Sequence, residues 1–139
     1  MRVKQLAKVL LSGTGANGVT PNAFETVEYQ NLTIAVTISA GFSAGTLKFQ
    51  GSINDIAGEL TQPNFANPAS ATNQWGYVQT VNLDTGATIN GSSGLSLASA
   101  GTFLLEVNAN GLSLLSAEIS GLTGSGTIDV VASGYGQNR

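Results

Sequence analysis

Alternating apolar and polar residues between positions 101 and 134 constrain the fold of this chain more than any other feature. In the strand expected at 102–109, every second residue is apolar, as in a half-buried strand: Phe103, Leu105, Val107 and Ala109. Asn110-Gly111 follows, the dipeptide most typical of a two-residue type I′ hairpin turn, because both residues tolerate positive φ. Further strands are expected at 112–120 and, after a small polar turn at 123–126, at 127–133. The stretch predicts a β-meander, with a β-bulge near Leu114 and Leu115, where the apolar phase slips.

Similar patterns earlier in the chain predict an all-β fold. Strands are expected over residues 4–11, 24–29, 32–39, 46–53, 74–83 and 87–90, with 91–99 as a loop or an edge strand. Inward side chains are expected at alternate positions of two of these strands: Leu32, Ile34, Val36, Ile38, Leu47 and Phe49. No window shows a capped helical stripe. The prediction is a single domain over residues 1–139, an antiparallel, jelly-roll-like β-sandwich.

The first 23 residues combine a short strand with a glycine-rich segment. They are expected to form an N-terminal arm that reaches a neighbouring subunit, or a frayed end or edge strand followed by a loop, with the core beginning at Phe24. Gly13, Gly15 and Gly18 match G-x-G-x-x-G, but Val19-Thr20-Pro21-Asn22 follows in place of the helix that a phosphate-binding loop requires. The apolar run at 9–11 is too short for a signal peptide or a membrane span, so a soluble chain with no membrane partner is expected.

Composition argues against an enzyme. The chain has no Cys and no His, which removes thiolate chemistry, the commonest general base and the commonest zinc ligand. We therefore expect no catalytic, cofactor-binding or metal-binding residues. With five basic residues and a net charge of −3, the chain lacks the basic surface that binds the phosphates of nucleic acid, so no nucleic-acid partner is expected. Only 9% of residues are charged, so the edge strands of this chain lack the charged residues that usually prevent pairing with other strands. These edges are expected to be covered by neighbouring subunits.

Asp84-Thr85-Gly86 resembles the active-site signature of retroviral-type aspartic proteases, in which two such aspartates, one from each subunit, share a proton. Asp-Thr-Gly is also ordinary turn chemistry, with Asp84 as the local acceptor and Gly86 at positive φ. The motif lies past the middle of the chain, whereas the protease pattern places it near the start. The turn is therefore the favoured interpretation, and the protease remains a remote alternative.

Two other stretches have a functional and a structural interpretation. Asn54, Asp55 and Glu59 offer oxygen ligands for calcium without EF-hand spacing, so an Asx turn is favoured. Residues 60–73 form the longest loop, which is either a site of partner contacts anchored by Phe65 or a solvated crossover between the sheets.

Four aromatic residues, with nearby Asn and Gln, offer a stacking platform for a sugar: Trp75, Tyr77, Tyr29 and Tyr135. They keep a carbohydrate-binding jelly roll of an adhesin or receptor-binding protein as the chief alternative function. Trp75 itself is favoured as a plug at the edge of the core.

From Gly45 onward, over about two-thirds of the chain, the order of features resembles that of small β-sandwich virion proteins of tailed bacteriophages. The matching features are the strand at 45–52 entering a Gly-Ser-x-Asn-Asp turn, Trp75 opening the next long strand, Gly111-Leu112 opening another, and a final Thr-x-Asp-Val strand at 127–130. The resemblance implies a non-enzymatic structural protein of the virion, such as head decoration, a head fibre or a tail or baseplate part. Its implied partners are other copies of itself and other virion proteins, such as major capsid or tail proteins, with a host surface glycan as a further possibility. Leu104 and Val131, on the outward phase of their strands, are expected to need such a cover.

Overall fold

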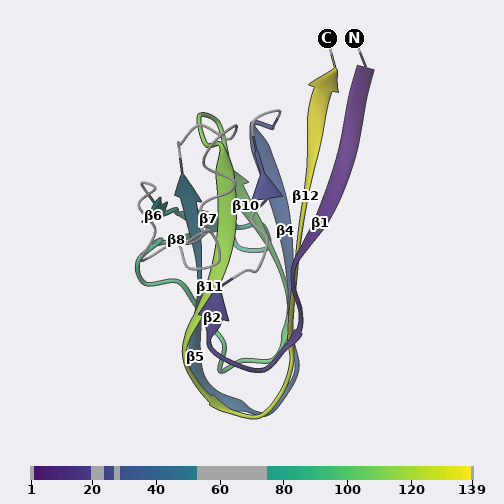
Figure 1. The fold of residues 1–139 in the computed structure, drawn as a ribbon. Coiled ribbons are helices and arrows are strands. Elements are labelled where there is room, and N and C mark those ends of the chain that lie inside the picture. Colours follow the sequence, from purple (N-terminus) through teal and green to yellow (C-terminus); the bar gives the residue numbers. More distant parts are fainter. Residues whose placement is uncertain (1, 20–23, 27–28, 53–74, 139) are drawn as a thin grey trace.

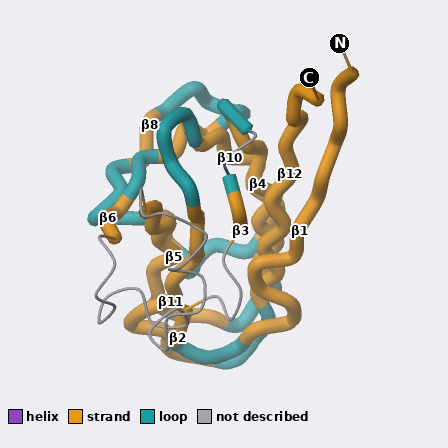
Figure 2. Tube along the Cα trace, turned by 45° about the horizontal axis from the view of Figure 1, so that its top comes forward, coloured by secondary structure: helices purple, strands orange, loops and turns teal. Residues whose placement is uncertain are grey.

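The computed structural model describes residues 2–19, 24–26, 29–52 and 75–138, which form strands and loops with no helix among them. The strands make two antiparallel sheets of six strands each (Figures 1 and 2). Sheet A has the order β1 (Arg2–Thr14), β12 (Ile128–Asn138), β4 (Asn31–Ile38), β10 (Gly101–Asn108), β7 (Thr80–Asn82) and β8 (Thr88–Ile89). Sheet B has the order β2 (Gly18–Val19), β11 (Leu114–Gly124), β5 (Phe42–Ser52) and β6 (Trp75–Tyr77), with β3 (Phe24–Glu25) also paired to β11 and β9 (Leu95–Ser96) to β5. The predicted all-β sandwich of two antiparallel sheets is confirmed.

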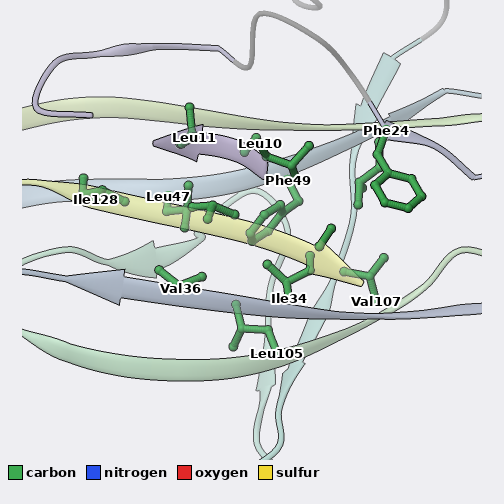
Figure 3. Packing of buried hydrophobic residues seen from close by; sticks show 14 of the residues in the cluster. Leu10, Leu11, Phe24, Ile34, Val36, Leu47, Phe49, Leu105, Val107 and Ile128 are labelled. Carbon is green, nitrogen blue, oxygen red and sulfur yellow. The ribbon is translucent and has the colours of Figure 1, made fainter. Parts of the chain in front are cut away.

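The core lies between the two sheets, where the apolar phases of facing strands meet (Figure 3). The inward residues expected on β4 and β5 are all buried, with exposed fractions of 2% or less: Leu32, Ile34, Val36, Ile38, Leu47 and Phe49. Leu105, Val107 and Ala109 of the 102–109 stretch are also fully buried. Period-2 alternation therefore identified the core face of these strands correctly, because alternate residues of a strand share one face of the sheet.

The predicted β-meander is wrong, because β10, β11 and β12 alternate between the sheets. β10 pairs with β4 and β7, β11 pairs with β5, and β12 pairs with β1 and β4. The turn after β10 is closed by a bond from Leu112 N to Ala109 O of 3.0 Å, and Gly111 has a φ of 89°. No described non-glycine residue, Asn110 included, has positive φ. These features fit a type II turn and not a type I′ hairpin turn. The turn carries the chain from sheet A to sheet B, so that the apolar faces of β10 and β11 meet in the core.

The predicted bulge near Leu114 and Leu115 is also wrong. The pairing of β11 with β5 is continuous from Leu114 opposite Ser52 to Ser120 opposite Thr46, and the register shifts only after Ser120. Leu114 and Leu115 lie on opposite faces of sheet B, Leu115 in the core and Leu114 on the outer face. Both are nevertheless buried, so the slip in the apolar phase does not require a bulge.

The strand predicted at 74–83 is divided between the two sheets. β6 pairs with β5 in sheet B, whereas β7 pairs with β10 in sheet A. The chain changes sheet at residues 78–79, where Val78 N donates to Phe49 O at 2.9 Å. The strand predicted at 24–29 is seen only as β3, since residues 27–28 lie outside the described part.

The N-terminal segment forms an edge strand of sheet A. β1 is 13 residues long and pairs with β12 from Arg2 opposite Asn138 to Thr14 opposite Ile128. A register shift after Val9 places both Leu10 and Leu11 inside, with exposed fractions of 2% and 6%. The expectation that the core begins at Phe24 is therefore wrong. Beyond the body, the ends of β1 and β12 continue as a two-stranded ribbon (Figure 1).

Candidate functional site

An apolar row crosses the outer face of sheet A. Val9 lies opposite Val131, Val131 opposite Ala35, and Ala35 opposite Leu104, so the row passes through β1, β12, β4 and β10. A bond of 2.9 Å from Leu83 N to Leu104 O continues the row at the end of β7. Directly opposed residues share a face of the sheet, and the neighbours of Val131 along β12, Val130 and Ala132, are buried in the core. The row therefore faces away from the core, as expected for Leu104 and Val131.

Exposure makes the apolar row unusual. Four large hydrophobic side chains are exposed in the described part of the chain: Val9 (56%), Leu104 (48%) and Leu83 (46%) lie in the row, and the fourth is Tyr77 (45%). The residues beside the row on β4 and β10 are three threonines, Thr33, Thr37 and Thr102, and one carboxylate, Glu106, while Asp129 lies beside Val131 on β12. Covering the row itself costs little hydration energy, because its side chains carry no polar groups.

A second feature, the Tyr77 cleft, lies on the outer face of sheet B. It has a volume of about 620 Å³ and is open to solvent. Its lining comes from the start of β2, from β5 and β6, and from β11: Asn17, Gly18, Lys48, Tyr77, Glu118, Ile119, Ser120 and Gly121. Strand register explains this set, because Lys48 lies opposite Glu118 and Tyr77 lies opposite Gln50, two residues along the same face of β5.

Glu118 is the polar centre of the cleft. Its Oε1 accepts a hydrogen bond from the Tyr77 hydroxyl at 3.0 Å, and its Oε2 accepts one from Nε2 of the buried Gln50 at 3.1 Å. The Lys48 ammonium lies over the Tyr77 ring, 5.0 Å from the ring centre. Partial burial, the hydrogen bond to Glu118 and the negative charge of that carboxylate raise the pKa of Tyr77 above its ordinary value.

At the rim of the cleft, Asn17 is fixed by a bond from Leu122 N to its Oδ1 at 2.9 Å. This bond orients the side-chain amide just before the start of β2. The cleft thus combines an aromatic ring, a carboxylate, an ammonium group and an amide on one sheet face.

Asp84 lies in an exposed turn between β7 and β8. Gly86 has the predicted positive φ, 75°. The expectation that Asp84 is the turn's acceptor is wrong: Asn82 Oδ1 accepts from Asp84 N at 2.9 Å, and Asn82 O accepts from Gly86 N at 2.7 Å. The motif's aspartate supplies a backbone N–H to the turn, and Asn82, two residues earlier, supplies both of these acceptors.

The other residues singled out from the sequence lie in different surroundings. Tyr29 is buried and packs edge-on against Phe24, with ring centres 5.5 Å apart, so it is no platform. Trp75 is part-buried on β6, on the outer face of sheet B opposite Ser52. Gly18, the last glycine of the G-x-G-x-x-G match, opens strand β2 and not a helix. The side chain of Tyr135, Phe65 with the 60–73 loop, and Asn54, Asp55 and Glu59 lie outside the described residues.

Sequence reasoning missed Lys48, Glu118, Gln50 and Asn17 as partners of Tyr77. Lys48 and Gln50 lie on β5, Glu118 on β11 and Asn17 just before β2, and only the pairing register brings these segments together. Within the described residues, no group of three or more His, Cys, Asp or Glu side chains is placed to hold a metal ion. The described part also contains no helix long and apolar enough to cross a membrane.

Fold and surface together define an open antiparallel β-sandwich with one apolar outer face and one polar cleft. No model of a known protein family matches the sequence, and no curated protein matches it. Two solved structures share the fold. The SPBc2 prophage-derived protein YomS matches with a TM-score of 0.67 and 10% identity over 97% of this chain and 96% of that one. The PBSX exported protein XepA matches with a TM-score of 0.64 and 18% identity over 97% of this chain, which corresponds to 39% of the XepA chain.

Proposed function

We propose that this protein is a non-enzymatic structural component of a bacteriophage particle that assembles through the outer face of sheet A. The observation that carries the proposal is the apolar row, which places three half-exposed large side chains in one line across the sheet. The fold supports a phage association, because 97% of this chain matches the fold of the prophage-derived YomS. Head decoration, a head fibre or a tail part are the roles this proposal covers, with the particle as the location.

The strength of the interface follows from the exposure of the row. Fully burying a Val or Leu side chain stabilises a complex by about 1.5–3 kcal/mol. Val9, Leu104 and Leu83 are each about half exposed, so covering them contributes about 2–4 kcal/mol. That energy alone corresponds to a millimolar dissociation constant at best. We therefore expect weak association of isolated chains and firm attachment only where several copies engage a particle at once.

The outer edge of β1 offers a second contact. Among the described residues β1 is the first strand of sheet A, and it pairs with β12 over most of its length. An edge strand is a template for the addition of another strand. Strand addition at this edge would extend sheet A and continue the face that carries the apolar row. The proposed partners are other copies of this chain and other particle proteins, such as capsid or tail proteins.

Sedimentation velocity over a wide concentration range tests the proposal. The wild-type chain is expected to show a sedimentation coefficient that rises with concentration, and Leu104→Ser is expected to abolish the rise. Tyr77→Ala is the matched control, because it removes a side chain of similar exposure from the other sheet and should leave the rise unchanged. A chain that stays monomeric throughout and does not co-sediment with purified particles would contradict the proposal.

A further inference from the structure

We propose that the Tyr77 cleft binds one unit of a neutral saccharide. This inference concerns the outer face of sheet B and does not depend on the assembly interface on sheet A. The cleft volume of about 620 Å³ falls within the range of small-molecule sites, roughly 300–1,000 Å³. Sugar sites combine an exposed aromatic ring with a few fixed polar groups, and the cleft has both.

The Tyr77 ring supplies the apolar surface. It is the one large exposed apolar side chain of the described residues that lies outside the apolar row. The apolar C–H face of a pyranose can pack on such a ring. Lys48 now lies over the ring, but a cation–π contact at an exposed site is weak. A sugar whose hydroxyls accept from the Lys48 ammonium can therefore take its place over the ring.

Two polar groups of the cleft, Glu118 and Asn17, are held in place before any ligand arrives. Tyr77 and Gln50 each donate one hydrogen bond to the Glu118 carboxylate, and a carboxylate can accept about four. Glu118 thus retains acceptor capacity for two sugar hydroxyls. Lys48 and Asn17, which also line the cleft, add donors, and Asn17 is fixed through its Oδ1 by Leu122 N. Groups that need no rearrangement give up less entropy on binding.

The charges of the cleft favour an uncharged ligand. Its lining contains one ammonium group, Lys48, and one carboxylate, Glu118, so the net charge is zero. A uronic acid can pair with Lys48 but brings its carboxylate into the same cleft as Glu118, and an amino sugar can pair with Glu118 but brings its ammonium near Lys48. In each case a like-charge contact offsets the ion pair. A neutral hexose or N-acetylhexosamine meets neither repulsion.

The cleft and the apolar row lie on the outer faces of different sheets of the sandwich. The strands of the two sheets can be followed in Figure 2. A chain held to a particle through sheet A would therefore present the cleft away from the attachment surface. This arrangement suits a component that meets polysaccharide from outside, while the cleft chemistry itself is complete in the isolated chain.

Saturation-transfer NMR on the full-length protein tests the inference. The probes are glucose, galactose and N-acetylglucosamine, each at millimolar concentration, with glucuronate and glucosamine as charged comparisons. We expect saturation transfer to at least one neutral sugar and weaker transfer to both charged ones. Tyr77→Ala and Glu118→Gln are each expected to weaken binding by roughly tenfold to a hundredfold. Leu104→Ser, on the other sheet, should leave binding unchanged.

Three results would overturn the inference: no transfer to any neutral sugar, tighter binding of glucuronate or glucosamine than of every neutral sugar, or equal binding by wild type and Tyr77→Ala. Thermal unfolding of each variant shows that the fold is retained, and the conservative Glu118→Gln keeps an acceptor for the Tyr77 hydroxyl. A failed particle-assembly assay would leave these readouts unaffected, so the two proposals stand or fall separately.

Discussion

Replacing Gly111 by valine tests how the chain crosses from sheet A to sheet B. Gly111 is the third residue of the turn that begins at Ala109, and its φ is 89°. No atom beyond its chain neighbours lies within 4 Å of the position of an added Cβ, so the cost is backbone strain alone. The left-handed region costs a non-glycine residue about 1–2 kcal/mol, and β-branching adds to this. We expect Gly111→Val to lower the free energy of unfolding by about 2–3 kcal/mol.

Two controls separate this strain from other effects. Gly76 on β6 is equally open to a Cβ but has no positive φ, so Gly76→Val places a β-branched residue where strands favour one. Asn110 has no positive φ either, and Asn110→Ala is expected to change stability by less than about 0.5 kcal/mol. Urea unfolding followed by circular dichroism measures all three variants. An unchanged value for Gly111→Val, or an equal loss for Asn110→Ala as a type I′ turn requires, would refute the reasoning.

Three further substitutions test other parts of the structure. Leu10→Ala should lower the free energy of unfolding by about 2–5 kcal/mol, because Leu10 is 2% exposed; a loss below about 0.5 kcal/mol would place β1 outside the core. Glu118→Gln should lower the pKa of Tyr77, measured by tyrosinate absorbance against Tyr77→Phe, because it removes the carboxylate's charge. The pKa of Tyr77 is raised in the folded state. The neutral phenol therefore stabilises the fold below about pH 10, and this stabilisation is lost as the pH rises through the folded-state pKa. An equal Tyr77 pKa in wild type and Glu118→Gln would contradict the hydrogen bond to Glu118. Asp84→Asn should leave stability unchanged because Asn82 supplies the turn's acceptors, and a peptidase activity that this change removes would contradict the turn interpretation.

Local sequence patterns predicted most of the longer strands and which of their faces are buried. In β4, for example, Leu32, Ile34, Val36 and Ile38 alternate with polar or small residues and all point into the core. Alternation succeeds here because burial on one face is a local property of each strand.

Strand pairing could not be predicted in the same way. Asn110-Gly111 is compatible with a type I′ hairpin and with a type II turn, and the choice depends on which strands complete each sheet. β10 finds its partner in β4, which is distant in sequence, and β11 finds its partner in β5. The same long-range pairing assembles the Tyr77 cleft, which explains why Tyr77 alone of its polar and aromatic lining residues stood out in the sequence.

The central claim is that the chain is a particle component, and its copy number in purified particles tests this most directly. Quantitative mass spectrometry would be applied to particles from a host that carries the gene, with wild type compared with Leu104→Ser. The account predicts a fixed number of wild-type copies per particle and a clear loss for Leu104→Ser, whose exposed side chain belongs to the apolar row. Particles that assemble fully while the wild-type chain remains in the soluble fraction would contradict it.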